Sequence, residues 1–173
     1  MKLNGKKIAY FIEDLFEDLE FWYPYLRMKE EGAESTIVAP KVKEYSGKHG
    51  LTVDAQIGIL GVNPLNFDAL IIPGGYSPDR MSRVPQMVEF VTKMNDENKI
   101  IAAISHGGLV LLSADVVKDK NVTSFFSIKA DMENAGGIWQ DHDVVCDKNL
   151  ITSRSPEDLP AFCRKIIEVL SSR

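Results

Sequence analysis

The chain has 173 residues, a formal net charge of −5 at pH 7, and 45% hydrophobic and 26% charged residues. These values predict a single globular domain over residues 1–173, and the scattered lysines and arginines argue against a nucleic-acid partner. No apolar run is long enough to cross a bilayer, and the segment Met1–Lys7 lacks the apolar core of a signal peptide. We therefore expect a cytoplasmic protein that does not contact membranes.

The cysteines and histidines form no recognisable ligand set. Cys146 and Cys163 lie in a predicted strand and a predicted helix, without the paired spacing of a zinc site or a disulfide framework. The histidines are far apart in the sequence, at His49, His106 and His142. We expect reduced cysteines, no structural metal and no cofactor.

Strands and helices alternate along the first hundred residues. A buried strand is predicted over 7–12, and a helix follows as far as Gly32 with apolar residues at helical spacing, namely Leu19, Trp22, Tyr23 and Leu26. Pro24 should kink or loosen this helix. The next predicted segments are a strand over 34–39, a polar surface loop over 40–50, an edge strand or hairpin within 52–57, a short helix starting at 63–64, a strand over 67–72 and a helix over 85–98.

The second half continues the alternation. A strand over 100–104 should turn abruptly into a helix over 109–112, and a loop with a short strand (116–123), a helix (127–135) and a hairpin (144–152) should follow. The last helix has the clearest pattern, with Ser155 as its N-cap and Pro156 at its first position. Its predicted buried face consists of Leu159, Phe162, Cys163, Ile166, Ile167 and Leu170.

This alternation predicts an α/β fold with a mostly parallel sheet covered on both faces, which binds ligands beyond the carboxyl ends of its strands. Three such ends carry distinctive residues: the acidic loop 13–18, Gly74-Gly75, and Ser105-His106. We expect them to converge on one pocket. The acidic loop would repel a phosphate by several kcal/mol at an effective dielectric of about 20, so a flavin or dinucleotide ligand is disfavoured. A phospho-receiver is disfavoured too, because no acceptor Asp ends the strand at 67–72.

The turn at Ser105-His106-Gly107-Gly108 has the outline of a nucleophile elbow. Such a turn holds one side chain above the sheet, where amide N–H groups and a helix N-terminus favour negative charge. However, the hydrolase pattern Gly-x-Ser-x-Gly is not met, because Ala103 occupies the first glycine position. The alternative is that Ser105 is simply a small residue in a tight turn and that His106 caps the helix.

Several motifs together resemble the PfpI intracellular-protease family, in the superfamily of the parkinsonism-associated protein deglycase. They are Phe16-Glu17-Asp18-Leu19-Glu20, Pro24-Tyr25, Lys29-Glu30-Glu31-Gly32, Gly47-Lys48-His49-Gly50, Pro73-Gly74-Gly75, Ala103-Ile104-Ser105-His106-Gly107, Thr123-Ser124 and Leu150-Ile151-Thr152-Ser153-Arg154. The resemblance runs nearly end to end. It implies a flavodoxin-like three-layer sandwich, a homo-oligomer between dimer and hexamer, and peptidase or cofactor-independent glyoxalase and deglycase activity on peptides or small carbonyl compounds.

The resemblance also implies roles for individual residues. Ser105 stands where the family has its nucleophilic cysteine, Glu17 matches the glutamate that holds that cysteine, and His106 matches the adjacent histidine. Asp79 matches the acid that pairs with this histidine from a neighbouring subunit. Gly75 and the amide of His106 match the oxyanion hole.

The departures from the family lie around this one site. Besides Ser105, Gly108 replaces a proline, Phe125 replaces a tyrosine and Asp79 replaces a glutamate. Several changes at one site favour natural divergence over a single designed substitution. Three functions stay open: an enzyme acting on small carbonyls, glycated groups or peptides; a catalytically silent member that binds a metabolite or partner or protects other proteins under stress; and a serine hydrolase, for which no Ser-His-acid relay is evident within one chain.

Overall fold

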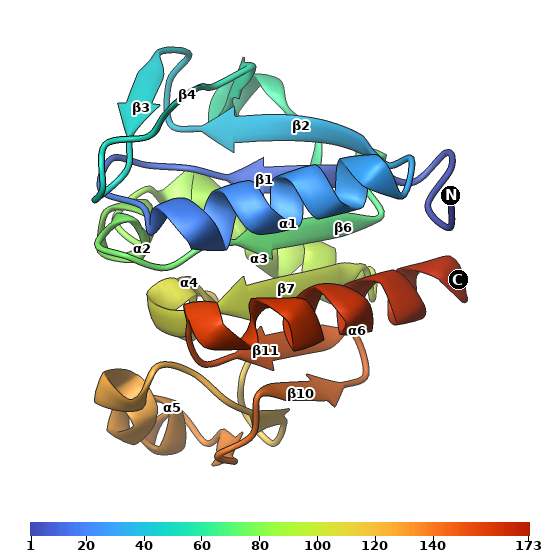
Figure 1. The fold of residues 1–173 in the computed structure, drawn as a ribbon. Coiled ribbons are helices and arrows are strands. Elements are labelled where there is room, and N and C mark those ends of the chain that lie inside the picture. The colour runs from blue at the N-terminus through green and yellow to red at the C-terminus, as the bar shows by residue number, and fades with distance from the viewer.

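The computed structural model describes residues 1–173 and is built on a seven-stranded sheet, ordered β10-β11-β7-β6-β1-β2-β5 (Figure 1). Neighbouring strands are parallel except for the antiparallel β10–β11 hairpin. The strands are β1 (Lys7–Phe11), β2 (Glu34–Ala39), β5 (Ile57–Gly58), β6 (Ala69–Ile72), β7 (Ile100–Ile104), β10 (Val144–Asp147) and β11 (Leu150–Ser153). The predicted mostly parallel sheet is confirmed.

Two small strand pairs lie outside this sheet. Strands β3 (Glu44–Ser46) and β4 (Thr52–Asp54) form an antiparallel pair, so the segment 40–50 is not entirely the loop that was predicted. Strands β8 (Asn121–Val122) and β9 (Ile138–Trp139) form a parallel pair. The latter strands have only two residues each, which is too short for a periodic sequence signal.

Helices cover both faces of the sheet, which confirms the three-layer sandwich. Alternate residues of β1 point to opposite faces, with Ile8 and Tyr10 in one apolar cluster and Ala9 and Phe11 in the other. Helices α1 (Asp18–Glu30) and α6 (Leu159–Ser171) contribute to the first cluster, and lie side by side in Figure 1. The second receives residues from α2 (Ser77–Met81), α3 (Pro85–Asp96), α4 (Gly108–Ser113) and α5 (Lys129–Asn134).

Helix α6 has the buried face that its periodicity predicts, since all six predicted apolar residues are buried. Its start differs from the prediction. Ser155 precedes a 3-10 turn, Pro156–Asp158, and makes no side-chain capping bond, whereas α6 proper begins at Leu159. Pro156 suits the first turn because a missing N–H costs nothing there.

The apolar residues singled out at helical spacing in α1 do not form its buried face, although Trp22 packs partly against the core. Leu19, Tyr23 and Leu26 are 55%, 40% and 57% exposed. The buried positions are instead Asp18, Glu20, Phe21, Pro24 and Met28. Because apolar residues recur at helical spacing on two faces of this helix, the pattern alone did not distinguish between them. The helix is thirteen residues long, contains Pro24 and ends at Glu30, close to the predicted stop at Gly32.

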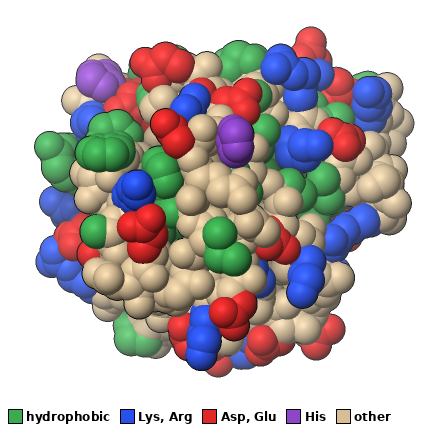
Figure 2. All heavy atoms as spheres, turned by 90° about the horizontal axis from the view of Figure 1, so that it is seen from below, with side chains coloured by type: hydrophobic (Ala, Val, Ile, Leu, Met, Phe, Trp, Pro, Cys, Tyr) green, Lys and Arg blue, Asp and Glu red, His purple; other side chains and the backbone are tan.

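The surface carries charges of both signs. Acidic and basic side chains are interspersed on the face drawn in Figure 2, with apolar groups between them. No helix combines the length and the hydropathy needed to cross a bilayer.

Candidate active site

Strand β7 ends in a sharp turn that presents Ser105. This residue has φ +60°, in the left-handed region that non-glycine residues seldom adopt, and it opens the short helical turn that leads into α4. Gly107 makes the turn possible, since a Cβ there would lie 2.8 Å from the carbonyl oxygen of Ile72. Ser105 is therefore held in a strained elbow at the carboxyl end of the sheet, as the nucleophile-elbow interpretation predicted.

A cleft of about 340 Å³ opens beside Ser105. It is lined from the loop after β1, the turn after β6 and the elbow after β7, so the three strand ends converge as expected. The lining residues are Glu17, Glu20, Lys48, Gly75, Tyr76, Ser105, His106, Phe125 and Pro156. Charged or polar residues thus alternate with the aromatic rings of Tyr76 and Phe125 along the lining.

The carboxyl group beside Ser105 belongs to Glu20, which corrects the assignment of Glu17 to this place. Glu20 is 1% exposed, and its Oε2 accepts a hydrogen bond from the amide of Gly74 at 2.7 Å. A side chain at Gly74 would collide with both Glu20 and Ser105, so a glycine is needed where these groups meet. Burial raises the pKa of Glu20 to about 8; the Gly74 amide opposes this shift and nearby Glu17 adds to it. Glu20 is therefore protonated at neutral pH and can donate a hydrogen bond toward the nucleophile position.

His106 lies against Ser105 and points away from any acid of its own chain. Its Nδ1 is 3.5 Å from Ser105 Oγ and its Nε2 is 2.9 Å from Ser127 Oγ. The ring stacks on Phe125 with 4.9 Å between centroids. Burial lowers the pKa of His106, and the positive charge of Lys48 lowers it further. The imidazole is therefore neutral at neutral pH. Sequence reasoning missed Ser127, which is 21 residues away in the chain and belongs to no motif.

Glu17 lies in the same cleft as Glu20 but makes different contacts. Its carboxylate pairs with Lys48 Nζ at 3.1 Å and with His49 Nε2 at 3.3 Å. Neighbouring Asp18 accepts hydrogen bonds from the amides of His49 and Leu51 at 2.9 and 2.8 Å. Glu17, Asp18 and His49 place ligand atoms within 4.8 Å of one another, a grouping that the sequence analysis did not foresee. These atoms already bind the loop to the start of α1, so the group acts as a structural anchor.

The model of the DJ-1/PfpI family matches residues 6–169. The chain belongs to the DJ-1/PfpI family. It is 45% identical to a deglycase of Pyrococcus abyssi, over 91% of this chain and 95% of that protein. It is 42% identical to General stress protein 18 of Bacillus subtilis, over 96% of this chain and 98% of that protein.

A solved structure shows the same fold. The two-domain protein of Anabaena variabilis, with a DJ-1/ThiJ/PfpI-like and a ferritin-like domain, superposes with a TM-score of 0.95 at 39% identity. The match covers 96% of this chain but 48% of that protein, so this chain spans about half its length.

Two further residues that the family resemblance singled out lie in different surroundings. Asp79 is exposed on α2, pairs with Arg83 and does not line the cleft, so any role of Asp79 in a neighbouring subunit stays a prediction. Gly75 does line the cleft and has φ +80°; a Cβ there would lie 2.5 Å from the backbone of Leu15 and of Glu17. Its amide donates none of the backbone hydrogen bonds of the surrounding turns, so a role in an oxyanion hole stays a prediction.

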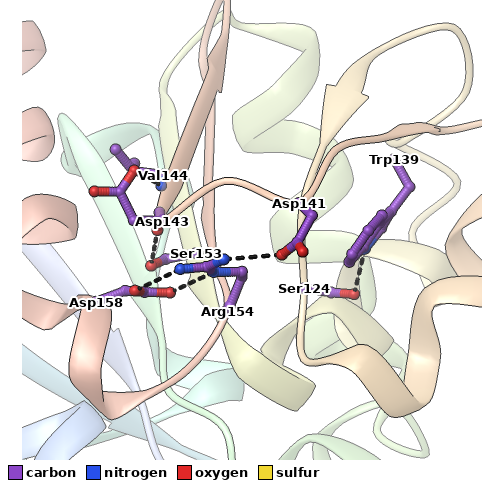
Figure 3. A network of polar contacts seen from close by, with 8 residues as sticks. All are labelled: Ser124, Trp139, Asp141, Asp143, Val144, Ser153, Arg154 and Asp158. Atoms are coloured by element: carbon purple, nitrogen blue, oxygen red, sulfur yellow. Dashed lines mark hydrogen bonds and ion pairs between the residues drawn. The ribbon is translucent and has the colours of Figure 1, made fainter.

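The family motif that ends in Arg154 has a structural role near the cleft (Figure 3). Arg154 Nε and Nη2 donate to Asp158 at 2.8 and 3.0 Å, and Nη1 donates to Asp141 at 2.8 Å. These bonds tie the loop after β11 to the start of α6 and to the segment before β10. Pro156, which forms one wall of the cleft, lies within the loop that is fixed in this way.

Proposed function

We propose that this DJ-1/PfpI protein takes small carbonyl compounds, glycated groups or short peptides into its cleft, and that it turns them over very slowly as sequenced. The observation that carries the proposal is an otherwise complete elbow site with Ser105 in place of a thiol. A serine hydroxyl is a far weaker nucleophile than a thiolate and needs a well-aligned base. The two cysteines of the chain cannot substitute, because Cys146 is on β10 and Cys163 is buried in α6.

Methylglyoxal turnover tests this proposal. Turnover by the protein as sequenced should be close to the uncatalysed rate. Ser105→Cys should raise turnover by at least about 100-fold, because a nucleophile acts as a unit with its neighbouring groups and the thiol restores the missing member of that unit. Ser105→Ala is the matched control and should behave like the unmodified protein. Turnover by the unmodified protein that Ser105→Ala abolishes would contradict the proposal.

A catalytically silent, protective or ligand-binding role is the second candidate. It is favoured by the same pairing of an intact cleft with a missing thiol, and by similarity to a protein named General stress protein 18. If it is correct, the protein as sequenced should suppress heat aggregation of a client enzyme, and Ser105→Ala should do so equally well. No suppression at equimolar concentration would exclude protection.

We also propose a homo-oligomer, between dimer and hexamer, with the mouth of the cleft near a subunit boundary. Tyr76 at this mouth is 65% exposed and would be covered at such a boundary, whereas Pro78 and Met81, which were expected to add to an apolar surface here, are buried. Light scattering of the purified protein tests this, and a monomer at micromolar concentration would remove the proposed role of Asp79 in trans. The free cysteines support a reducing compartment, and we place the protein in the cytoplasm.

A further inference from the structure

The hydroxyl of Ser127 completes a line of three polar side chains within one chain. Ser127 lies in the 3-10 turn Phe126–Ile128, and its Oγ is 2.9 Å from His106 Nε2. On the other side of the imidazole, Nδ1 is 3.5 Å from Ser105 Oγ. That separation is long for a hydrogen bond, but catalytic pairs are commonly loose without substrate and tighten when it binds. No such relay within one chain was expected from the sequence.

The protonation of the neighbouring groups gives this line a direction. Protonated Glu20 can donate a hydrogen bond to Ser105 Oγ, which leaves the Ser105 hydrogen free for His106 Nδ1. A neutral imidazole that accepts at Nδ1 carries its proton on Nε2. The nearest partner of that N–H is Ser127 Oγ, which then accepts. Glu20, Ser105 and His106 thus each donate to the next group, and Ser127 is the final acceptor.

We propose that Ser127 is the positioning residue of a Ser105–His106–Ser127 relay, in which His106 accepts the Ser105 proton and makes this serine an oxygen nucleophile for small activated acyl and phosphonyl compounds. Phe125 fixes the plane of the ring by stacking, and Ser127 fixes the tautomer. This inference goes beyond the proposed function, which concerns chemistry that needs a thiolate.

The reaction with an alkyl fluorophosphonate illustrates the step. Ser105 Oγ forms a bond to phosphorus, the P–F bond breaks, and fluoride leaves with the bonding electron pair. The Ser105 proton passes to His106 Nδ1. The free amide of Gly75 lines the same cleft, where it can stabilise the negative charge that develops on the phosphoryl oxygen.

Long-range proton–nitrogen NMR correlation on the unmodified protein reads the tautomer directly, since the chain has three histidines. We expect His106 to carry its proton on Nε2. Ser127→Ala should give a mixture of both tautomers, and Ser127→Thr, which keeps the hydroxyl, should retain the Nε2–H form. A proton on Nδ1 in the unmodified protein would overturn the proposal.

Labelling with an alkyl fluorophosphonate, followed by peptide mass spectrometry, tests the reactivity. We expect the label on Ser105, none in Ser105→Ala, and in Ser127→Ala a rate lower by about five-fold to ten-fold, as for the loss of one neutral hydrogen bond. Ser127→Thr should recover the rate, and circular dichroism should show every variant folded. An unlabelled Ser105, or an unchanged rate in Ser127→Ala, would refute the relay. Neither result affects the methylglyoxal test of Ser105→Cys, so the two proposals fail independently.

Discussion

Helices α1 and α6 cover the same face of the sheet with thirteen residues each, yet they use their apolar residues differently. The six predicted apolar residues of α6 are all buried. Helix α1 leaves large apolar residues exposed and buries a carboxyl group, Glu20, at the cleft. Helix α6 thus contributes buried apolar side chains, whereas α1 also buries an ionisable carboxyl group, whose burial is costly unless it keeps its proton.

The largest expected effect is on packing by α6. Phe162→Ala should lower the free energy of unfolding by about 3–5 kcal/mol, because it removes a fully buried ring and leaves a cavity. Urea denaturation followed by circular dichroism measures this. A loss below about 1 kcal/mol, the typical value for an average substitution, would mean that α6 does not anchor this face.

The second effect is on the pH dependence of stability. Glu20 has a folded-state pKa of about 8 against an ordinary 4.5, so the folded state holds this proton more tightly. The contribution of this proton to the free energy of unfolding is complete below pH 4.5 and is lost as the pH rises to 8. The free energy of unfolding should fall by up to about 1.4 kcal/mol per pH unit in this range. In Glu20→Gln, the free energy of unfolding, measured by urea denaturation at each pH, should decline less between pH 5 and pH 8.

Glu17→Gln is the matched control, because Glu17 is an acid of the same cleft that pairs with Lys48 at the surface of the protein. The unfolding free energy of this variant should keep most of its decline between pH 5 and pH 8, because burial is the main cause of the raised pKa of Glu20 and the charge of Glu17 is a lesser one. Identical pH profiles for Glu20→Gln and the unmodified protein would show that Glu20 is not the proton-retaining group.

A smaller effect is expected at the start of α1. Asp18→Asn should cost about 1–3 kcal/mol, because the buried carboxylate accepts two amides of the loop 47–51 and hydrogen bonds to a charged group are the stronger kind. Hydrogen exchange of the His49 and Leu51 amides should become faster. Unchanged exchange at both amides would contradict the anchoring role.

The smallest effect is expected on the exposed face of α1. Leu26→Ala should change the free energy of unfolding of the isolated chain by no more than about 0.5 kcal/mol, since the side chain is 57% exposed. Phe162→Ala, measured under the same denaturation conditions, shows how much larger the loss of stability is at a buried position of α6 than at this exposed position of α1. A loss as large as that of Phe162→Ala would mean that α1 packs through this face.

Much of the architecture was predictable because local patterns agree with it. Strand β2 has the predicted bounds, β7 is uniformly apolar because both of its faces are covered, and the turn at Ser105 follows it as expected. Helix α2 was not predicted, as its five residues around Pro78 carry no periodic signal. Strand β8 lies within the segment 116–123, where a short strand was predicted, whereas its two-residue partner β9 was not predicted, for the same reason as α2.

The assignment of Glu17 to the place beside Ser105 came from the family resemblance. Helical periodicity could not correct it, because α1 has apolar residues at helical spacing on two faces and only one of these faces turns Glu20 toward the cleft. The buried face of Phe21, Pro24 and Met28 brings Glu20 inward, four residues before Pro24. The spacing between Glu20 and Pro24 could thus have identified Glu20 as the inward-facing acid. The contact between His106 and Ser127 depends on how two turns pack, which no local pattern specifies.

We expect the elbow to remain shaped for a reactive nucleophile although it holds a serine. Iodoacetamide labelling of Ser105→Cys against pH, with Cys146 and Cys163 resolved by peptide mass spectrometry, tests it most directly. The helix N-terminus and the protonated Glu20 should stabilise the thiolate, so the introduced thiol should have a pKa below the ordinary value of about 8.5 and should react faster than a free cysteine at neutral pH. A thiol that labels no faster than free cysteine would contradict a preserved site.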